Sequence, residues 1–343
     1  MKKLRFTLDQ TGHLSQEDTR KYFSVVGFAI FAFVLVQNLA SLALSALIAR
    51  VAPFVIENAI LYQIINMLPI YLFALPVLIL ILSQLPSVSP LSEPLGAKGW
   101  WGGLCCTVTM MTLGNYLSQM IILWFEMMMQ KEQTNPVETI TQNSPWWINL
   151  IFIAILAPIL EELVFRKILC QKLLPLGEGY AILISAVIFG LCHGNFFQFF
   201  YAFGIGLILA LVYVKTGKLI HTITFHAIIN FFGGVFAPWI LTKLDMDKLY
   251  EALETVIESN YTNVDPLHPY MQPLMLISTY SSLMYAAAIV GTVLLIKSRK
   301  KHTLDSGILP PPKDGKVANV FMNTGVAAAL AAFTLVFITS LLF

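Results

Sequence analysis

The middle of the chain places ionisable and amide side chains inside three stretches that are otherwise apolar. A carboxylate with two imidazoles can activate water for hydrolysis. It does so either by holding Zn²⁺ with an open water position or by taking the proton of the water directly. The residues are Glu161, Glu162 and Arg166 in APILEELVFRKIL, His193 in VIFGLCHGN, and His226 and Asn230 in LIHTITFHAIINFF.

Helical spacing separates these residues by the chemistry that each can do. Glu162 and Arg166 are four residues apart, so they share a helix face and can pair. Glu161 is turned by about 100° from Glu162, which leaves its carboxylate free to act as a general base or a metal ligand. His226 and Asn230 are also four residues apart, and imidazole and amide N–H groups are usable donors to an oxyanion.

The composition excludes a soluble enzyme and a disordered chain. Of the 343 residues, 57% are hydrophobic and 12% are charged. A soluble domain averages about 45–50% apolar and about 25% charged residues. So little charge cannot cover a soluble globule, and we expect an integral membrane protein with the lipid bilayer as a partner. The net charge of +2 gives no reason to expect nucleic-acid binding.

Nine stretches are long and apolar enough to cross a bilayer core of about 30 Å, which needs about 20 such residues. The predicted fold is an all-α, polytopic helical membrane protein with eight or nine transmembrane helices in one membrane domain, residues 1–343. The helical rise puts Glu161, His193 and His226 inside the hydrocarbon region, where they can form a His₂Glu zinc site or activate water without metal. The expected spans are 22–49, 58–83, 101–129, 147–168, 179–194, 196–214, 219–241, 274–296 and 318–343.

The positions of lysine and arginine predict the orientation in the membrane. With the N-terminus inside, 17 of the 21 Lys and Arg residues fall on the cytoplasmic side, as the positive-inside rule favours. We expect residues 1–21 to be a cytoplasmic tail and residues 297–316 to be a basic cytoplasmic loop. A bacterial plasma membrane is the expected location, and the eukaryotic endoplasmic reticulum membrane is the alternative.

Three short motifs resemble those of the CAAX-protease and bacteriocin-processing family of intramembrane endopeptidases. They lie in the family's order on successive spans, and residues 147–241 are therefore the expected motif-bearing catalytic core. Glu161-Glu162-xxx-Arg166 resembles EExxxR, Phe189-xxx-His193 resembles FxxxH, and His226-xxx-Asn230 resembles HxxxN.

The resemblance implies an all-helical fold with a cavity and an endopeptidase activity on a membrane-associated peptide or membrane protein. It leaves open whether Zn²⁺ takes part, because a metal-dependent and a glutamate-type mechanism are both associated with the family. It does not imply that the substrate is prenylated. By residue, it implies that Glu161 and His193 activate the water, that His226 and Asn230 form the oxyanion site, and that Glu162 and Arg166 hold the helix in shape.

Two other classes of function fit the same residues. A proton-coupled transporter would use Glu161 and His193 as a proton relay. It would be expected to carry an internal repeat, which the sequence does not show. A catalytically silent immunity or scaffold protein would bind a peptide in the same cavity and would keep its biological activity without Glu161.

Overall fold

The computed structural model describes residues 3–298 and 303–342, and nearly all of its regular structure is helical. The only β-pairing among these residues is an isolated bridge between Leu8 and Leu14. The elements labelled η are wide π-helical turns (η1, η2, η3, η5) or tight 3₁₀ turns (η4, η6). In chain order the elements are α1 (Gln16–Val51), α2 (Phe54–Glu57), α3 (Ala59–Leu68), η1 (Pro69–Ala74), α4 (Leu75–Leu82), α5 (Ala97–Met129), α6 (Pro136–Gln142), α7 (Trp146–Asn149), η2 (Leu150–Leu156), α8 (Ala157–Glu162), η3 (Leu163–Cys170), α9 (Gln171–Leu173), η4 (Leu174–Leu176), α10 (Glu178–Leu191), α11 (Phe196–Thr216), α12 (Leu219–Phe231), η5 (Phe232–Phe236), α13 (Ala237–Leu241), α14 (Met246–Glu258), η6 (Asp265–Leu267), α15 (His268–Ser298), α16 (Lys316–Phe321) and α17 (Thr324–Leu342).

The predicted all-helical membrane fold is confirmed, with a smaller number of clear spans. Two of the nine predicted spans differ from the rest within the described residues. Residues 101–129 lie in α5, which is long but falls outside the set of sufficiently apolar helices. Residues 179–194 overlap α10, which has only 14 residues. The seven helical runs long and apolar enough to cross a membrane are Gln16–Val51, Ile60–Leu82, Trp146–Leu176, Phe196–Thr216, Leu219–Leu241, Asp265–Ser298 and Thr324–Leu342.

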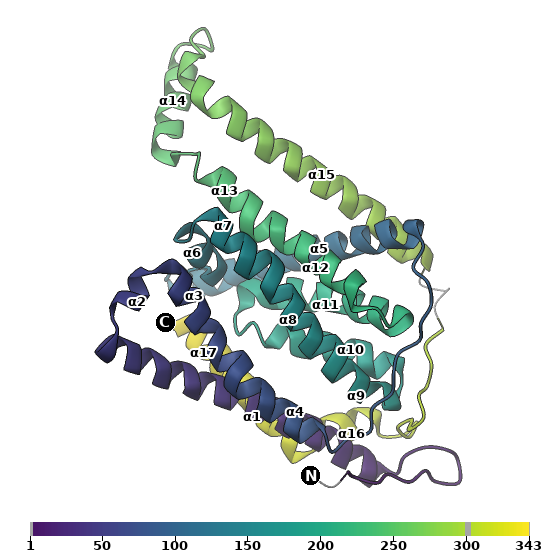
Figure 1. The fold of residues 1–343 in the computed structure, drawn as a ribbon. Helices are drawn as coiled ribbons and strands as arrows, with labels where there is room; N and C mark the ends of the chain where they lie inside the picture. The colour runs from purple at the N-terminus through teal and green to yellow at the C-terminus, as the bar shows by residue number, and fades with distance from the viewer. Residues whose placement is uncertain (1–2, 299–302, 343) are drawn as a thin grey trace.

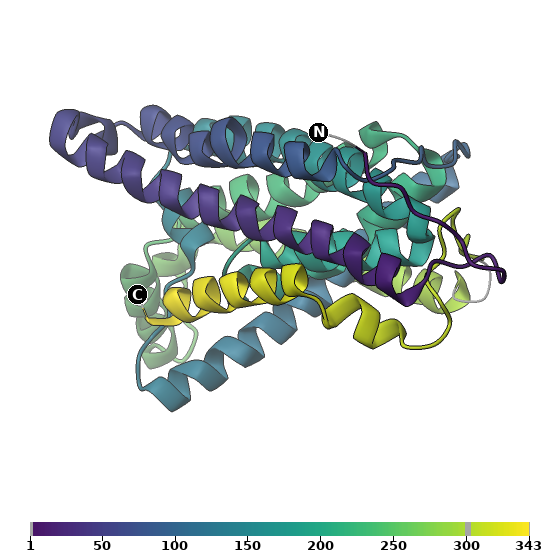
Figure 2. The same ribbon diagram turned by 90° about the horizontal axis from the view of Figure 1, so that it is seen from below.

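The helices that carry the predicted site lie in the centre of the molecule (Figure 1). The run from α7 to α9 packs beside α10 and α12, and α11 packs against α10 and α5. On one side, α1 packs along α17 and along the α4 run, and these helices form a layer beside the central helices in Figure 1. Figure 2 shows α1 between the α4 run and α17. On the other side, α15 packs against α5, and the α14–α15 hairpin projects away from the centre.

Three of the π-helical turns have a common cause in the sequence. η1, η2 and η5 each end two residues before a proline, which is Pro76, Pro158 or Pro238. Proline lacks a backbone N–H, and its ring clashes with the carbonyl four residues earlier, so the helix widens in the preceding turn. The prolines therefore set the local geometry of the helical runs that carry the site.

A tight turn joins α10 to α11 and fixes the end of α10. Gly194 adopts a φ of +70°, which a side chain would disfavour. The side chain of Asn195 accepts a hydrogen bond from the Gln198 N–H at 3.0 Å and caps α11. A Cβ on Gly190 would lie 2.9 Å from the Phe199 carbonyl oxygen, so glycine allows the two helices to pack closely. The hairpin places His193 at the C-terminal end of α10.

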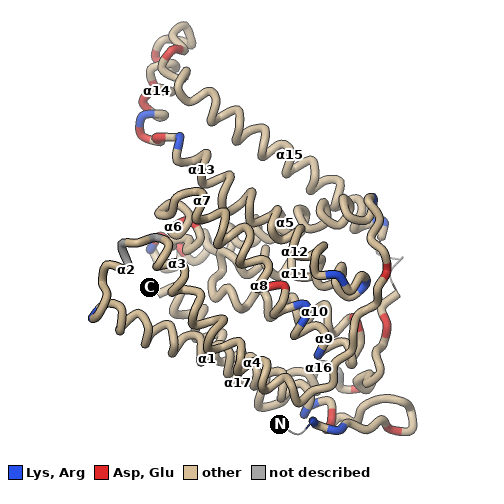
Figure 3. Tube along the Cα trace, viewed as in Figure 1, with Lys and Arg blue, Asp and Glu red and all other residues tan. Residues whose placement is uncertain are grey.

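Charged residues lie mainly at the ends of the helices (Figure 3). Many of the Lys and Arg positions gather near the N-terminal tail, α9 and the start of α12. The bodies of the central helices are almost free of charge, and the clear acidic exception is the position of α8. Glu161 and Glu162 therefore lie among helices that carry few other charged residues.

Candidate active site

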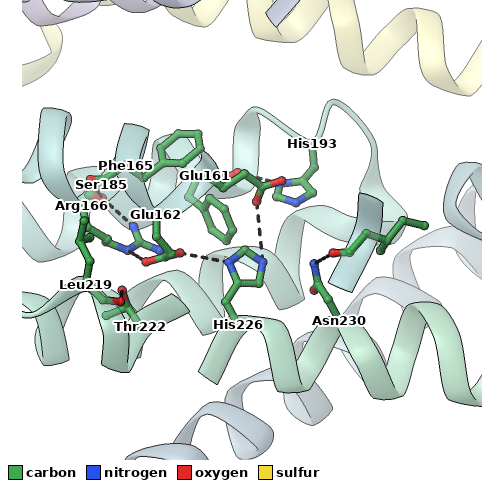
Figure 4. Close-up of polar contacts among 12 residues, drawn as sticks. Glu161, Glu162, Phe165, Arg166, Ser185, His193, Leu219, Thr222, His226 and Asn230 are labelled. Atoms are coloured by element: carbon green, nitrogen blue, oxygen red, sulfur yellow. Dashed lines mark hydrogen bonds and ion pairs between the residues drawn. The ribbon is translucent and has the colours of Figure 1, made fainter. Parts of the chain in front are cut away.

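The structure brings the predicted site residues together from three helical runs (Figure 4). Glu161 and Glu162 end α8, and Arg166 follows one turn later in η3. His193 comes from the turn after α10. His226 and Asn230 lie on α12, one helical turn apart.

Glu162 and Arg166 form the predicted ion pair, and both side chains are fully buried. The Arg166 Nε atom donates to Glu162 Oε2 at 2.9 Å. Arg166 also donates to the Ser185 hydroxyl at 2.9 Å, and that hydroxyl donates to the Phe165 carbonyl at 3.0 Å. The guanidinium carbon lies 5.1 Å from the centre of the Phe189 ring. Further bonds of this kind are needed to stabilise a buried charge pair. Here they satisfy the Nε and Nη1 atoms of Arg166 and hold η3 against α10, while the buried Nη2 atom has no partner among the described residues.

Glu162 has a second partner, which helical spacing along the sequence does not predict. Its Oε1 atom lies 3.1 Å from His226 Nδ1, and His226 is 64 residues further along the chain. A carboxylate paired with Arg166 accepts hydrogen bonds, so we assign the donating proton to His226 Nδ1. Carboxylates commonly orient functional imidazoles in this way. Glu162 therefore links α8 to α12 as well as to η3.

Glu161 lies near the Nε2 atom of His226 and lines the same cavity as His193. The His193 Nδ1 atom lies 2.8 Å from the Phe189 carbonyl, which can only accept, so Nδ1 carries the proton and Nε2 is free. The distance from Glu161 Oε2 to His226 Nε2 is 3.7 Å, which is too long for a direct hydrogen bond. The Oε2 atom is buried and has no hydrogen-bond partner among the described residues. A buried polar atom of this kind calls for a water molecule or a ligand group.

Asn230 has a structural contact on the neighbouring run. Its Nδ2 atom donates to the Ile153 carbonyl at 2.9 Å. The Ala157 N–H bonds five residues back to the Phe152 carbonyl, and at the same spacing the Ile153 carbonyl would pair with Pro158, which has no N–H. Asn230 thus satisfies a carbonyl that the proline leaves without a partner. The second N–H of the amide remains available.

A zinc site would need ligand atoms that converge on one point. Across residues 3–298 and 303–342, no group of three His, Cys, Asp or Glu side chains is arranged to hold a metal ion. The side chains described include Glu161, His193 and His226, the three ligands that the sequence offers. Whether they hold zinc stays a prediction.

A cavity of about 100 Å³ adjoins Glu161 and His193. Two polar residues in its wall, Gln37 of α1 and Tyr71 of η1, were not predicted as site residues. They lie outside the three motifs, and their one signal in the sequence is that they are polar groups within apolar spans. The first two spans therefore contribute to the surroundings of the site.

Comparison with known proteins agrees with the motifs. Residues 143–232 match the family described as type II CAAX prenyl endopeptidase Rce1-like. The membrane-embedded CAAX protease MroQ of Staphylococcus aureus is 35% identical over 96 residues, which cover 26% of this chain and 39% of MroQ. YdiL of Bacillus subtilis is 32% identical over 104 residues, covering 30% of this chain and 42% of YdiL. The UPF0177 protein YxdF of Lactococcus lactis is 27% identical over 121 residues, covering 35% of this chain and 67% of YxdF. No solved structure matches the chain significantly.

The matched segment contains every residue of the predicted site. Fold and site define a polytopic helical membrane protein with a carboxylate–imidazole centre inside its helices. Residues 143–232 of this membrane protein are similar to the Rce1-like CAAX prenyl endopeptidase family, and the relatives matched over part of their length include a CAAX protease and a putative membrane peptidase. The chain spans about two fifths of the length of MroQ and of YdiL, 39% and 42%.

Proposed function

We propose that this protein is an intramembrane endopeptidase that hydrolyses a peptide bond in a membrane-associated peptide or protein. One observation carries the proposal. The buried Glu161 oxygen without a partner stands in a cavity wall with His193 and lies 3.7 Å from His226 Nε2. A carboxylate oxygen without a hydrogen-bond partner, near one imidazole and in the same cavity as another, is suited to hold and deprotonate a water molecule. The family match over residues 143–232 supports the same reaction.

In the proposed reaction Glu161 is the general base. The free Nε2 atom of His193 accepts a hydrogen bond from the same water and orients its lone pair toward the scissile carbonyl. Burial excludes bulk water and strengthens both interactions. Glu161 then returns the proton to the leaving amine nitrogen as the peptide bond breaks.

His226 and Asn230 are proposed to stabilise the oxyanion. The Nδ1–H of His226 is directed to Glu162 at 3.1 Å. Its Nε2 atom therefore faces Glu161, 3.7 Å away, and donates to the oxyanion when it carries a proton. The N–H of Asn230 not used by the Ile153 carbonyl can donate to the same oxygen.

The proposed setting is a bacterial plasma membrane with a cytoplasmic N-terminus. Residues 147–241 are the proposed catalytic core of a single membrane domain, residues 1–343. The tail 1–21 and the loop 297–316 face the cytoplasm in this proposal. The bacterial relatives and the gathering of Lys and Arg near the N-terminal tail support this setting (Figure 3).

Mass spectrometry of membrane peptides tests the activity. Cells with the wild-type protein are compared with cells that carry Glu161→Ala at equal membrane abundance. The proposal requires fragments that appear only with the wild type. Identical peptide sets would contradict hydrolysis and favour a peptide-binding protein, while Glu161-dependent proton flux in vesicles would favour a transporter.

A further inference from the structure

Four polar side chains line one cavity of about 100 Å³. Glu161 and His193 come from the central helices, and Gln37 and Tyr71 come from α1 and η1. The remaining wall is apolar apart from a thiol, and includes Phe33 and Phe165. A water molecule takes about 30 Å³ of liquid, so the space admits a reacting peptide group and a water molecule.

The side chains of Gln37 and Tyr71 have no hydrogen bond to another residue within the described parts of the chain. Two other polar side chains on α1 do find partners: Asn38 donates to the Val34 carbonyl at 2.8 Å, and Tyr22 donates to the Lys172 carbonyl. A polar group left without a partner at membrane depth costs free energy. The two groups that face the site are therefore available to a molecule that enters the cavity.

The position of Tyr71 also follows from the helix geometry. It lies in η1, the π-helical turn that precedes Pro76. Such turns rotate the side chains that follow them relative to a regular α-helix and are frequent at functional sites. The α3–η1–α4 run packs against α1 and η3, which holds Tyr71 in the lining of the cavity that Glu161 also lines.

We propose that the Tyr71 hydroxyl donates a hydrogen bond to the carbonyl oxygen of the scissile peptide bond, and that the Gln37 amide binds a neighbouring peptide group of the same substrate. This inference rests on the proposed function. Water attacks the carbonyl carbon, its proton passes to Glu161, and the carbonyl electron pair moves onto oxygen. This oxygen accepts from Tyr71 in addition to the His226 and Asn230 donors of the proposed function. The C–N bond then breaks, and the proton moves from Glu161 to the amine nitrogen.

The assignment gives the helices outside the matched segment a role in substrate choice. The family match begins at residue 143, whereas Gln37 and Tyr71 belong to the first two spans. The Tyr71 hydroxyl and the Gln37 amide would both bind peptide groups of the substrate, and such groups are accessible in an extended backbone. The substrate class is therefore a segment unwound at the cleavage site, because a helix keeps its peptide groups bonded internally.

The test uses the purified full chain in lipid nanodiscs and the peptide whose cleavage depends on Glu161 in the membrane-peptide comparison. Tyr71→Phe keeps the ring and removes the hydroxyl, and we expect kcat per folded molecule to fall about 10²-fold with KM little changed. Gln37→Leu should raise KM more than it lowers kcat. Tyr62→Phe is the matched control, because Tyr62 is an exposed tyrosine on the same run.

A second measurement does not depend on turnover. A phosphinate analogue of the cleaved peptide carries oxygens that stand for the oxyanion. It should bind Tyr71→Phe about 10²-fold more weakly than it binds the wild type. The substrate peptide is measured with Glu161→Gln added to stop cleavage, and it should then bind with equal affinity whether residue 71 is Tyr or Phe. Wild-type kcat and wild-type phosphinate affinity in Tyr71→Phe would overturn the assignment and leave the proposed function intact. The absence of any Glu161-dependent cleavage would overturn both.

Discussion

Two adjacent carboxylates occupy different environments in this protein. Glu162 is fully buried, and both of its oxygens accept bonds, from Arg166 at 2.9 Å and from His226 at 3.1 Å. Glu161 is 25% exposed, and its Oε2 atom has no partner among the described residues. A satisfied buried charge holds the structure in place, whereas an unsatisfied one in a cavity is available to water and substrate. One step along α8 thus separates structural support from proposed chemistry.

The largest expected effect contrasts the two carboxylates directly. Glu161→Gln should lower kcat by about 10²–10⁴-fold, the range for a lost general base, with an unchanged melting temperature. Glu162→Gln is the matched variant, and it should lower the melting temperature because it leaves Arg166 without its counter-charge. Calorimetry and peptide cleavage on both variants measure the contrast. Normal turnover by folded Glu161→Gln would break the comparison.

Arg166→Ala tests whether the Glu162–Arg166 pair has a structural role. It leaves Glu162 buried without a counter-charge, and breaking a buried pair costs about 3–5 kcal/mol. We expect lower yield in membranes and a lower melting temperature. Lys167→Ala, at the exposed neighbouring position, should change neither. An Arg166→Ala protein that is fully stable but inactive would instead assign Arg166 to the chemistry.

Asn230 has both a structural contact and a proposed catalytic role, so its loss should affect both the melting temperature and kcat. Asn230→Ala removes the donor to the Ile153 carbonyl, which we expect to cost about 1–3 kcal/mol of stability. If its second N–H reaches the oxyanion, kcat per folded molecule should also fall by about 10²–10³-fold with KM little changed. Asn115→Ala on an exposed position of α5 is the control. A lower melting temperature with unchanged kcat would leave Asn230 as a purely structural residue.

The smallest expected effect concerns the outer part of the Arg166 network. Ser185→Ala removes the hydroxyl that accepts from Arg166 at 2.9 Å, and the stability loss should be about 1–3 kcal/mol. Activity per folded molecule should stay near the wild-type value. Ser118→Ala is a matched control, since the buried Ser118 hydroxyl has no partner in the described part of the chain and its removal should cost nothing. A large loss of kcat in folded Ser185→Ala would extend the chemistry beyond Glu161.

The sequence by itself identified the membrane class and every residue of the matched motifs. Charged groups are rare and costly in apolar spans, so Glu161, Glu162 and Arg166 could be found without a structure. The Glu162–Arg166 pair was predictable because a spacing of four residues on one helix fixes the geometry locally. Length and apolar composition predicted the helical fold for the same local reason, although α5 and α10 do not qualify as clear spans.

Tertiary structure decided which groups meet across helices. The contact between Glu162 and His226 joins residues 64 positions apart, and it depends on how α8 and α12 are rotated against each other. The use of Asn230 by the Ile153 carbonyl depends on the π-helical turn that Pro158 imposes on a different run. Gln37 and Tyr71 reach the cavity only because α1 and η1 pack beside the central helices. Helical periodicity determines the face on which a side chain lies, but packing alone determines the neighbour that this face meets.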